Sequence, residues 1–186
     1  AQAPEANLFA GAATTTIAIE VPPGRGVMTP KLALHYSSAA GASPYGHGWD
    51  LPLGRIQRSL KHGTLSCEHP GAQRHFVVHL PGIDVECTIP AHAPAAWQPC
   101  LPRVEDAFLR IYHEPAANLW RVYDKGGRRY FFGDAAARLG STTQAAWMAG
   151  DPCRYTFAWA LSRIEDAHGN TIEMSYQPDQ GVLYPT

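Results

Sequence analysis

The sequence predicts a mostly β protein built from antiparallel hairpins and meanders, with minimal helix. Gly (17) and Pro (16) are abundant among the 186 residues and follow no repeating period, which is typical of a turn-dense β protein. Apolar and polar residues also alternate over several short runs, as they do in strands that bury one face. With 45% hydrophobic and 17% charged residues, the composition is that of a folded chain rather than a disordered one.

Two alternating runs near the N-terminus, residues 14–21 and 31–37, predict a pair of half-buried strands. A rigid turn of prolines and glycines separates the two runs. Its members are Pro22, Pro23, Gly24 and Gly26. The prolines withhold two backbone donors and so end the first strand, and we expect Gly24 or Gly26 to adopt positive φ and turn the chain.

A glycine-rich loop follows the second run and contains Gly46 and Gly48, directly before Trp49. A large aromatic side chain gains most of its stabilising effect from burial. We therefore expect Trp49 to be largely buried and to anchor this loop against a core. These residues are structural candidates, because no catalytic group accompanies them.

The middle of the chain predicts further strands and very little helix. A hairpin is expected over residues 75–87, and three strands over residues 108–132 are expected to form a meander. Residues 90–102 contain four prolines and are expected to be an irregular loop. Only residues 135–139 and 143–148 have a helix-friendly composition, enough for one or two helical turns.

The last predicted hairpin spans residues 153–176, where alternating aromatic and apolar residues flank a turn. The candidate turn residues are Asp166, Gly169 and Asn170. Asp and Asn side chains bond to nearby backbone groups and glycine supplies positive φ, which is the chemistry that a tight turn requires. Because Glu165 and Asp166 are sequence neighbours, we expect solvated edge and turn charges rather than a paired-carboxylate site.

The order of these motifs resembles one family of proteins. The run IEVPPGRGVMTPKLALHYSS, followed by GASPYGHGWDL and GRIQR, is similar to the opening module of SpvB-type virulence proteins, of the B components of insecticidal Tc toxin complexes and of related Rhs/YD-repeat proteins. Ala18 and Lys31 depart from the family pattern, but neither lies in the turn or in the glycine-rich element. The IEDAHGN hairpin resembles a first YD-type repeat. The resemblance implies a partial β-shell of Rhs/YD-repeat type.

The resemblance divides the chain into four parts. They are a flexible lead at 1–8, an SpvB/Tc-B-like N-terminal β module at 9–152, a first YD-type repeat hairpin at 153–176, and a continuation or truncated end at 177–186. We expect the last hairpin to leave an unpaired strand edge, through which the chain self-associates or holds the rest of its polypeptide. The start at Ala1, without methionine, fits either signal cleavage or an excised segment.

The charge of the chain and the motifs that its sequence lacks argue against several kinds of functional site. The formal net charge is −1 with no basic run, so nucleic-acid binding is not expected, and no apolar run is long enough for a membrane span. The nine histidines show no HxH or HExxH spacing, so no metal is expected. Without a GxSxG or phosphate-binding motif, we expect no catalytic residue and no cofactor, and the chain is predicted not to be an enzyme.

Four cysteines lie far apart in the chain and lack the paired spacing of a zinc ribbon. They are Cys67, Cys87, Cys100 and Cys153. We expect them to be mostly buried thiols. In an exported protein they would instead form two disulfides, with three possible connectivities that the sequence does not distinguish.

The function implied by the resemblance is that of a non-enzymatic structural module in a secreted or extracellular bacterial toxin or Rhs-type shell, which encloses or delivers a toxic polypeptide. The implied partner is the remainder of its own Rhs/YD-repeat polypeptide or a toxin-complex subunit. The alternative is a secreted β-rich module that recognises glycan or protein on a surface. Trp97 and Trp147, which lie in irregular segments, are the aromatic candidates for that role.

Overall fold

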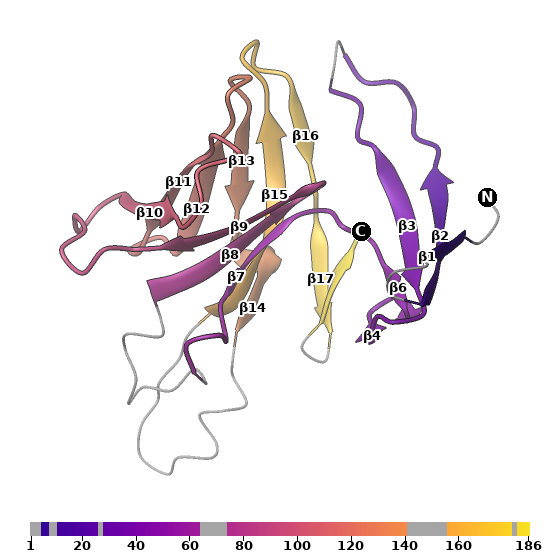
Figure 1. Cartoon of the computed structure of the whole chain (residues 1–186). Coiled ribbons are helices and arrows are strands. Elements are labelled where there is room, and N and C mark those ends of the chain that lie inside the picture. The colour runs from indigo at the N-terminus through magenta and orange to yellow at the C-terminus, as the bar shows by residue number, and fades with distance from the viewer. Residues whose placement is uncertain (1–4, 8–10, 26–27, 64–73, 141–155, 180–181) are drawn as a thin grey trace. The chain divides into compact units, whose positions relative to one another are not determined.

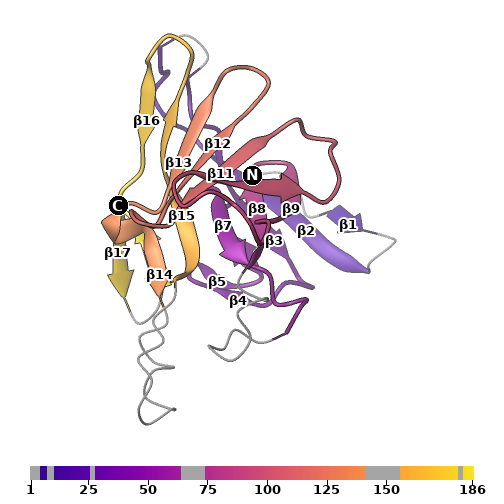
Figure 2. The same ribbon diagram turned by 90° about the vertical axis from the view of Figure 1, so that its left-hand side faces the viewer.

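The computed structural model describes residues 5–7, 11–25, 28–63, 74–140, 156–179 and 182–186 (Figures 1 and 2). The chain forms two compact units, Ala1–Leu53 and Gly54–Thr186. The predicted fold class is confirmed, because antiparallel strands make up nearly all of the regular structure in the described residues. Among the described residues there is no α-helix, and η2 (Ala135–Ala137) is a 3₁₀ turn.

The first unit contains a four-stranded antiparallel sheet in the order β1-β2-β3-β6 and a small β4–β5 hairpin. The strands are β1 (Glu5–Asn7), β2 (Ala12–Ile19), β3 (Leu32–Ser37), β4 (Ala42–Ser43), β5 (Gly46–His47) and β6 (Trp49–Asp50). The β2–β3 pair confirms the two strands expected near the N-terminus.

Burial along β2 does not alternate as the sequence predicts. Ile17 and Ile19 are each 37% exposed, although Leu34 and Leu32 lie directly opposite them on β3. The described part of this unit is one sheet with a small hairpin, so it has few residues of its own to cover the apolar face. The alternation therefore predicts the strand and its two faces but not how deeply one face is buried.

The second unit is organised by a closed ring of antiparallel strands, β7-β8-β9-β10-β11-β12-β13-β15. The strands are β7 (Arg55–Arg58), β8 (His75–Leu80), β9 (Ile83–Thr88), β10 (Gln98–Pro102), β11 (Arg110–Glu114), β12 (Leu119–Tyr123), β13 (Arg129–Phe132) and β15 (Thr156–Glu165). The long β15 closes the ring, because its first half pairs with β7 and its second half with β13. Figure 1 shows β15 beside β13.

Four short strands complete this unit. They are β14 (Arg138–Gly140), β16 (Thr171–Glu173), β17 (Tyr176–Asp179) and β18 (Val182–Pro185). Both β14 and β16 pair with β15, and β17 pairs with β18. Every part of β15 from Thr156 to Glu165 therefore lies next to a neighbouring strand.

The ring is filled by side chains from its strands, several of which alternate between buried and half-buried residues. On β8, for example, Phe76, Val78 and Leu80 are buried while their neighbours are half-buried. Trp120 and Trp159 have no exposed surface, and their ring centroids lie 5.5 Å apart in an edge-to-face arrangement. Aromatic pairs of this kind contribute about 0.5–1.5 kcal/mol beyond burial. An eight-stranded ring is just wide enough for such side chains to fill it.

Several local predictions are confirmed and others are wrong. The hairpin over 75–87 and the meander over 108–132 form as expected. The proline-rich loop over 90–102 ends in a strand, β10. The helix-friendly stretch 135–139 forms one 3₁₀ turn, η2, and is strand from Arg138 onward. The expected helical turn at 143–148 lies outside the described residues.

The last hairpin forms, but it does not present the edge that the sequence predicts. Trp159 lies on a strand with neighbours on both sides, because β7 and β14 flank it. The returning strand ends at Glu173 and Tyr176 begins β17, where its hydroxyl donates to the Leu161 carbonyl oxygen at 2.7 Å. The prediction of an unpaired strand edge beside Trp159 is therefore wrong, because β7, which is distant in the sequence, pairs with that edge.

Cys87 and Cys100 form a disulfide with an S–S distance of 2.09 Å, so the expectation of buried thiols is wrong for this pair. Pairing of β9 with β10 brings their Cα atoms to 5.4 Å, within the range that a disulfide requires. Both cysteines are 2% exposed. Cys67 and Cys153 lie outside the described residues.

Candidate functional site

Gly24 holds the turn after Pro22 and Pro23 through close backbone approach. Its φ lies outside the left-handed region, and Gly26 lies outside the described residues, so positive φ at one of the two glycines stays a prediction. A Cβ on Gly24 would lie 2.2 Å from the Met28 carbonyl oxygen. The Gly24 N–H also donates to Thr29 Oγ1 at 2.9 Å. Any side chain at this position would force the turn open.

Gly46 and Gly48 both adopt positive φ, at 113° and 82°. A Cβ on Gly48 would lie 2.6 Å from Cε2 of Tyr36, so only glycine fits beneath this ring. The Tyr36 and Trp49 rings pack with centroids 5.1 Å apart. Trp49 is of intermediate burial, so most of its side chain is covered but it is not a fully buried core residue. It stands on β6, a two-residue strand at the end of a small sheet, which leaves part of the ring uncovered.

Asp166 closes the β15–β16 turn as a buried acceptor. Its Oδ1 accepts the His168 and Asn170 backbone N–H groups at 2.8 and 2.9 Å, and its Oδ2 accepts the Asn170 side-chain amide at 2.8 Å. The Asn170 side-chain bond lowers the pKa of Asp166, and the backbone bonds add to this against the opposing effect of burial. Gly169 adopts φ 82°. The expected solvated charge is wrong here, since Asp166 is 5% exposed.

His113 is a buried titratable group inside the ring. It is 9% exposed, and its ring lies 4.5 Å from that of Trp120. Neither imidazole nitrogen has a hydrogen-bond partner among the described residues. The pKa of His113 is lowered to about 4, chiefly by burial and further by the Arg58 cation. The Asn118 side chain raises the pKa and so opposes both. The sequence did not single out His113, because a histidine at an inward position of a predicted strand carries no motif.

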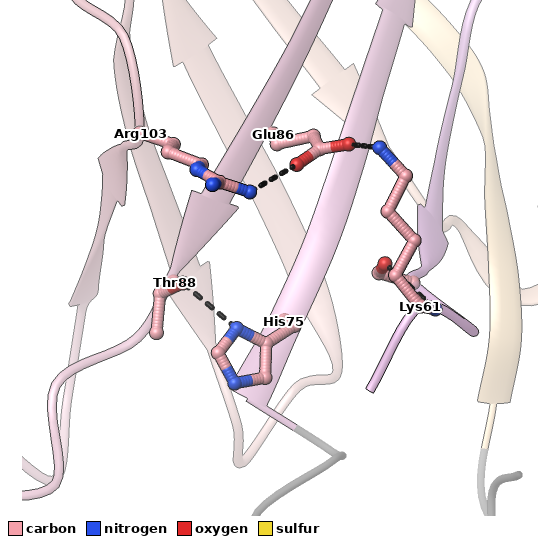
Figure 3. Close-up of polar contacts among 6 residues, drawn as sticks. Lys61, His75, Glu86, Thr88 and Arg103 are labelled. Carbon is pink, nitrogen blue, oxygen red and sulfur yellow. Dashed lines mark hydrogen bonds and ion pairs between the residues drawn. The ribbon is translucent and has the colours of Figure 1, made fainter. Parts of the chain in front are cut away.

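A polar network lies across β8 and β9 and the segments next to them (Figure 3). Glu86 forms ion pairs with Lys61 and, at 3.6 Å, with Arg103. The hydrogen bond from Lys61 lowers the pKa of Glu86. His75 Nδ1 and Thr88 Oγ1 lie 2.9 Å apart on opposed residues. These contacts tie strands together, and exposed pairs of this kind contribute at most about 1 kcal/mol each.

A groove of about 870 Å³ lies on the outer side of β11 and β12. We call it the aromatic–basic groove, after the residues that line it. These include Trp97, Phe108, Tyr112, Tyr123, Arg110, Arg121 and Lys125. Of the two tryptophans considered for surface recognition, Trp97 lies in this groove and Trp147 lies outside the described residues.

The described residues contain no cluster of three or more His, Cys, Asp or Glu that would hold a metal ion. Over the same ranges, no helix is long and apolar enough to cross a membrane.

These features define a class: a β-rich module with a closed, filled ring and rigid glycine turns. Residues 7–73 match the family described as SpvB, the Salmonella virulence plasmid 65kDa B protein. The chain is also 28% identical over 188 residues to the mono(ADP-ribosyl)transferase SpvB of Salmonella choleraesuis (strain SC-B67), covering 92% of this chain. The chain is thus similar to the N-terminal part of SpvB, the resemblance that its motifs predicted.

Two solved structures share the fold. The N-terminal domain of effector protein SpvB from Salmonella typhimurium strain LT2 is 26% identical, with a TM-score of 0.67 over 90% of this chain and 55% of that one. The TcdB2-TccC3 structure is 21% identical, with a TM-score of 0.71 over 96% of this chain and 9% of that one. At this identity, the second match shows the fold alone.

The prediction that the chain is not an enzyme is contradicted by its relatives. The curated proteins that it matches are named mono(ADP-ribosyl)transferases. The chain spans 30% of the length of these relatives. The prediction considered only the motifs within these 186 residues. An activity that is named for a whole protein need not leave a motif in each of its parts.

Proposed function

We propose that this chain is a structural module of a bacterial toxin, and that it helps to form a shell which encloses or delivers a toxic polypeptide. The observation that carries this proposal is the closed ring of β7–β13 and β15, in a chain that resembles the SpvB N-terminal domain over 90% of its length. A closed ring leaves no free edge within itself, so it suits a rigid wall element.

The ring itself does not hold the cargo. Its interior is occupied by Trp120, Trp159 and Phe76, each with at most 2% of its surface exposed. A toxic polypeptide would therefore be enclosed by walls that this module helps to build, together with other segments. The exposed Ile17 and Ile19 on β2 support this proposal, because assembly into a larger wall would bury them.

The partner in this proposal is the remainder of the chain's own Rhs/YD-repeat polypeptide or a toxin-complex subunit, as in the TcdB2-TccC3 complex that shares its fold. Residues 153–176 are proposed as the first YD-type repeat of such a polypeptide. Secretion from the bacterium is part of the proposal and is supported by the Cys87–Cys100 disulfide, since disulfides persist mainly in oxidising compartments.

Co-expression tests this function. The tagged chain is produced together with the polypeptide encoded directly downstream of it, and the two are purified on the tag. We expect a stoichiometric complex by native mass spectrometry. Trp159→Ala, which removes a fully buried side chain from the ring, is the matched control and is expected to abolish the complex. A folded wild-type chain that emerges alone would contradict the proposal.

The second candidate function, a secreted β-rich module that recognises glycan or protein on a surface, is favoured by the aromatic–basic groove. In this groove the Arg121 guanidinium lies over the ring of Trp97, and the Lys125 ammonium lies near the exposed ring of Phe108. The chemistry of this groove indicates which of the two ligands it fits.

A further inference from the structure

The aromatic–basic groove faces outward because the strands beneath it alternate. On β11 and β12, Ile111, Trp120 and Val122 point into the ring and are at most 2% exposed. The residues between them point outward, where Tyr112 lies opposite Arg121. Part of the groove therefore lies on the face of the sheet, where backbone groups are already paired and side chains must recognise a ligand.

The cations of the groove lean on aromatic rings and have no carboxylate partner. The Arg121 guanidinium carbon lies 4.2 Å from the Trp97 ring centroid, and Lys125 Nζ lies 5.9 Å from that of Phe108. Among the described residues, neither of these cations nor Arg110 forms an ion pair within 4.0 Å.

Two carboxylates also line the groove, but one of them is already engaged. Asp124 accepts the Gly126 and Arg128 backbone N–H groups at 2.8 and 3.0 Å, and the Tyr130 hydroxyl at 3.1 Å. Glu105 is exposed. Arg110, Arg121 and Lys125 outnumber these two carboxylates, so the groove has a small surplus of positive charge, and this favours an anionic ligand.

The segment that borders the groove is unusually apolar for a surface. Leu101, Val104 and Phe108 are 55%, 66% and 61% exposed, within eight residues of one another. Phe108 also adopts φ 52°, a left-handed conformation that a non-glycine residue holds at a cost of about 1–3 kcal/mol. Exposed apolar side chains beside a polar rim are typical of protein interaction surfaces.

We propose that the aromatic–basic groove binds an acidic peptide segment with apolar side chains, contributed by the partner polypeptide of the proposed function. Carboxylates of the segment pair with Arg110, Arg121 and Lys125, and its apolar side chains pack on Phe108 and Trp97. Tryptophan, tyrosine and arginine dominate the energetics of protein interfaces. A sugar would gain little from Leu101 and Val104, which offer no hydrogen bonds. This inference rests on the proposed function for the source of the segment.

The test uses the 186-residue chain and a fluorescein-labelled probe peptide, EFELDLEFD, followed by fluorescence anisotropy. We expect saturable binding that weakens as salt is raised, because charge pairing contributes. Arg121→Gln and Phe108→Ala are each expected to weaken binding about 10-fold or more, as interface anchors do. Arg55→Gln is the matched control, since Arg55 is an exposed arginine on β7, and it should bind as the wild type does.

Two further probes complete the design, a lysine counterpart peptide, KFKLKLKFK, and the anionic trisaccharide sialyllactose. Neither is expected to bind. Sialyllactose binding without binding of the acidic peptide would overturn the inference in favour of a glycan site. An acidic peptide that does not bind, or that binds both variants as tightly as the wild type, would also overturn it. Neither result affects the co-expression complex, which tests the proposed function separately.

Discussion

His113 should make the folded state sensitive to mild acid. In the folded chain its pKa is lowered from 6.5 to about 4, chiefly because the imidazole is buried among aromatic rings. In the unfolded chain the ring is solvated and regains its ordinary pKa. As the pH falls below about 6.5, protonation therefore favours the unfolded state, and stability is lost until the folded pKa is reached.

The size of this effect follows from the difference between the two pKa values, 6.5 and about 4. Each unit corresponds to about 1.4 kcal/mol, so the lowering amounts to roughly 3 kcal/mol in full. When the pH falls from about 7.5 to about 4.5, this protonation should lower the free energy of unfolding by about 2.5 kcal/mol, most of the full effect. Other groups contribute in the same range, because burial also lowers the pKa of His75.

The assay is urea unfolding followed by tryptophan fluorescence at several pH values, for the wild type and for His113→Leu. Leucine is similar in volume and titrates nowhere, so the variant should be within about 1.5 kcal/mol of the wild type at neutral pH. Its loss of stability on acidification should be smaller than that of the wild type by about 2–3 kcal/mol. Equal losses in the two proteins would refute the argument that His113 is buried in its neutral form.

Three further predictions concern the frame of the ring and its turns. Gly133→Ala should lower the unfolding free energy by about 2 kcal/mol or more in urea titrations, because the added Cβ would lie 2.4 Å from the Trp159 ring. Gly82 also adopts positive φ but faces open space, so Gly82→Ala should cost only about 1–2 kcal/mol. Equal costs would contradict this. The Cys87→Ala/Cys100→Ala double variant should be about 2–4 kcal/mol less stable by the same titration, given the 13-residue separation, and an unchanged urea midpoint would argue against the disulfide. Asp166→Ala should lower the thermal midpoint more than Asp166→Asn does, and equal midpoints would exclude the acceptor role of Asp166. Because the pKa of Asp166 is lowered in the folded chain, the stability that its ionised carboxylate contributes should be lost only when the pH falls below the ordinary pKa of an Asp side chain.

The local elements were largely predictable from the sequence. Alternation and turn residues are short-range signals, so they give the 75–87 hairpin, with Gly82 at φ 76°, and the 108–132 meander. The strand β10 was missed because Pro99 and Pro102 normally exclude a strand. This strand changes partner along its length, pairing with β11 through Cys100 and with β9 from Leu101, so few of its donors are needed on either side.

Closure of the ring was not predictable in the same way. It depends on contacts between distant segments, such as the bond from Arg58 Nε to the Thr156 carbonyl oxygen, 98 residues away. No local pattern encodes which strand β15 pairs with. The same limit applies to the candidate site. Trp97 was a candidate because it lies in an irregular segment, whereas its contact with the Arg121 guanidinium depends on how distant segments pack.

The glycine turns show a mixed outcome for a physical reason. Asn170 and Gly169 satisfy rules that depend on neighbouring residues, and the IEDAHGN turn forms around them. Burial of Trp49 and conformation at Gly24 depend on what packs against them. These properties are set by contacts with Tyr36 and Met28, and the turn pattern does not specify these contacts.

The central claim, that this module forms part of a shell around a toxic polypeptide, is tested most directly by limited proteolysis of the co-expressed complex. The cleavage rate of the downstream polypeptide is measured by mass spectrometry with the wild-type chain and with Trp159→Ala. The account predicts that the wild-type chain protects a continuous segment of that polypeptide and that the variant does not. Equal cleavage rates in the presence of a folded wild-type module would contradict the claim.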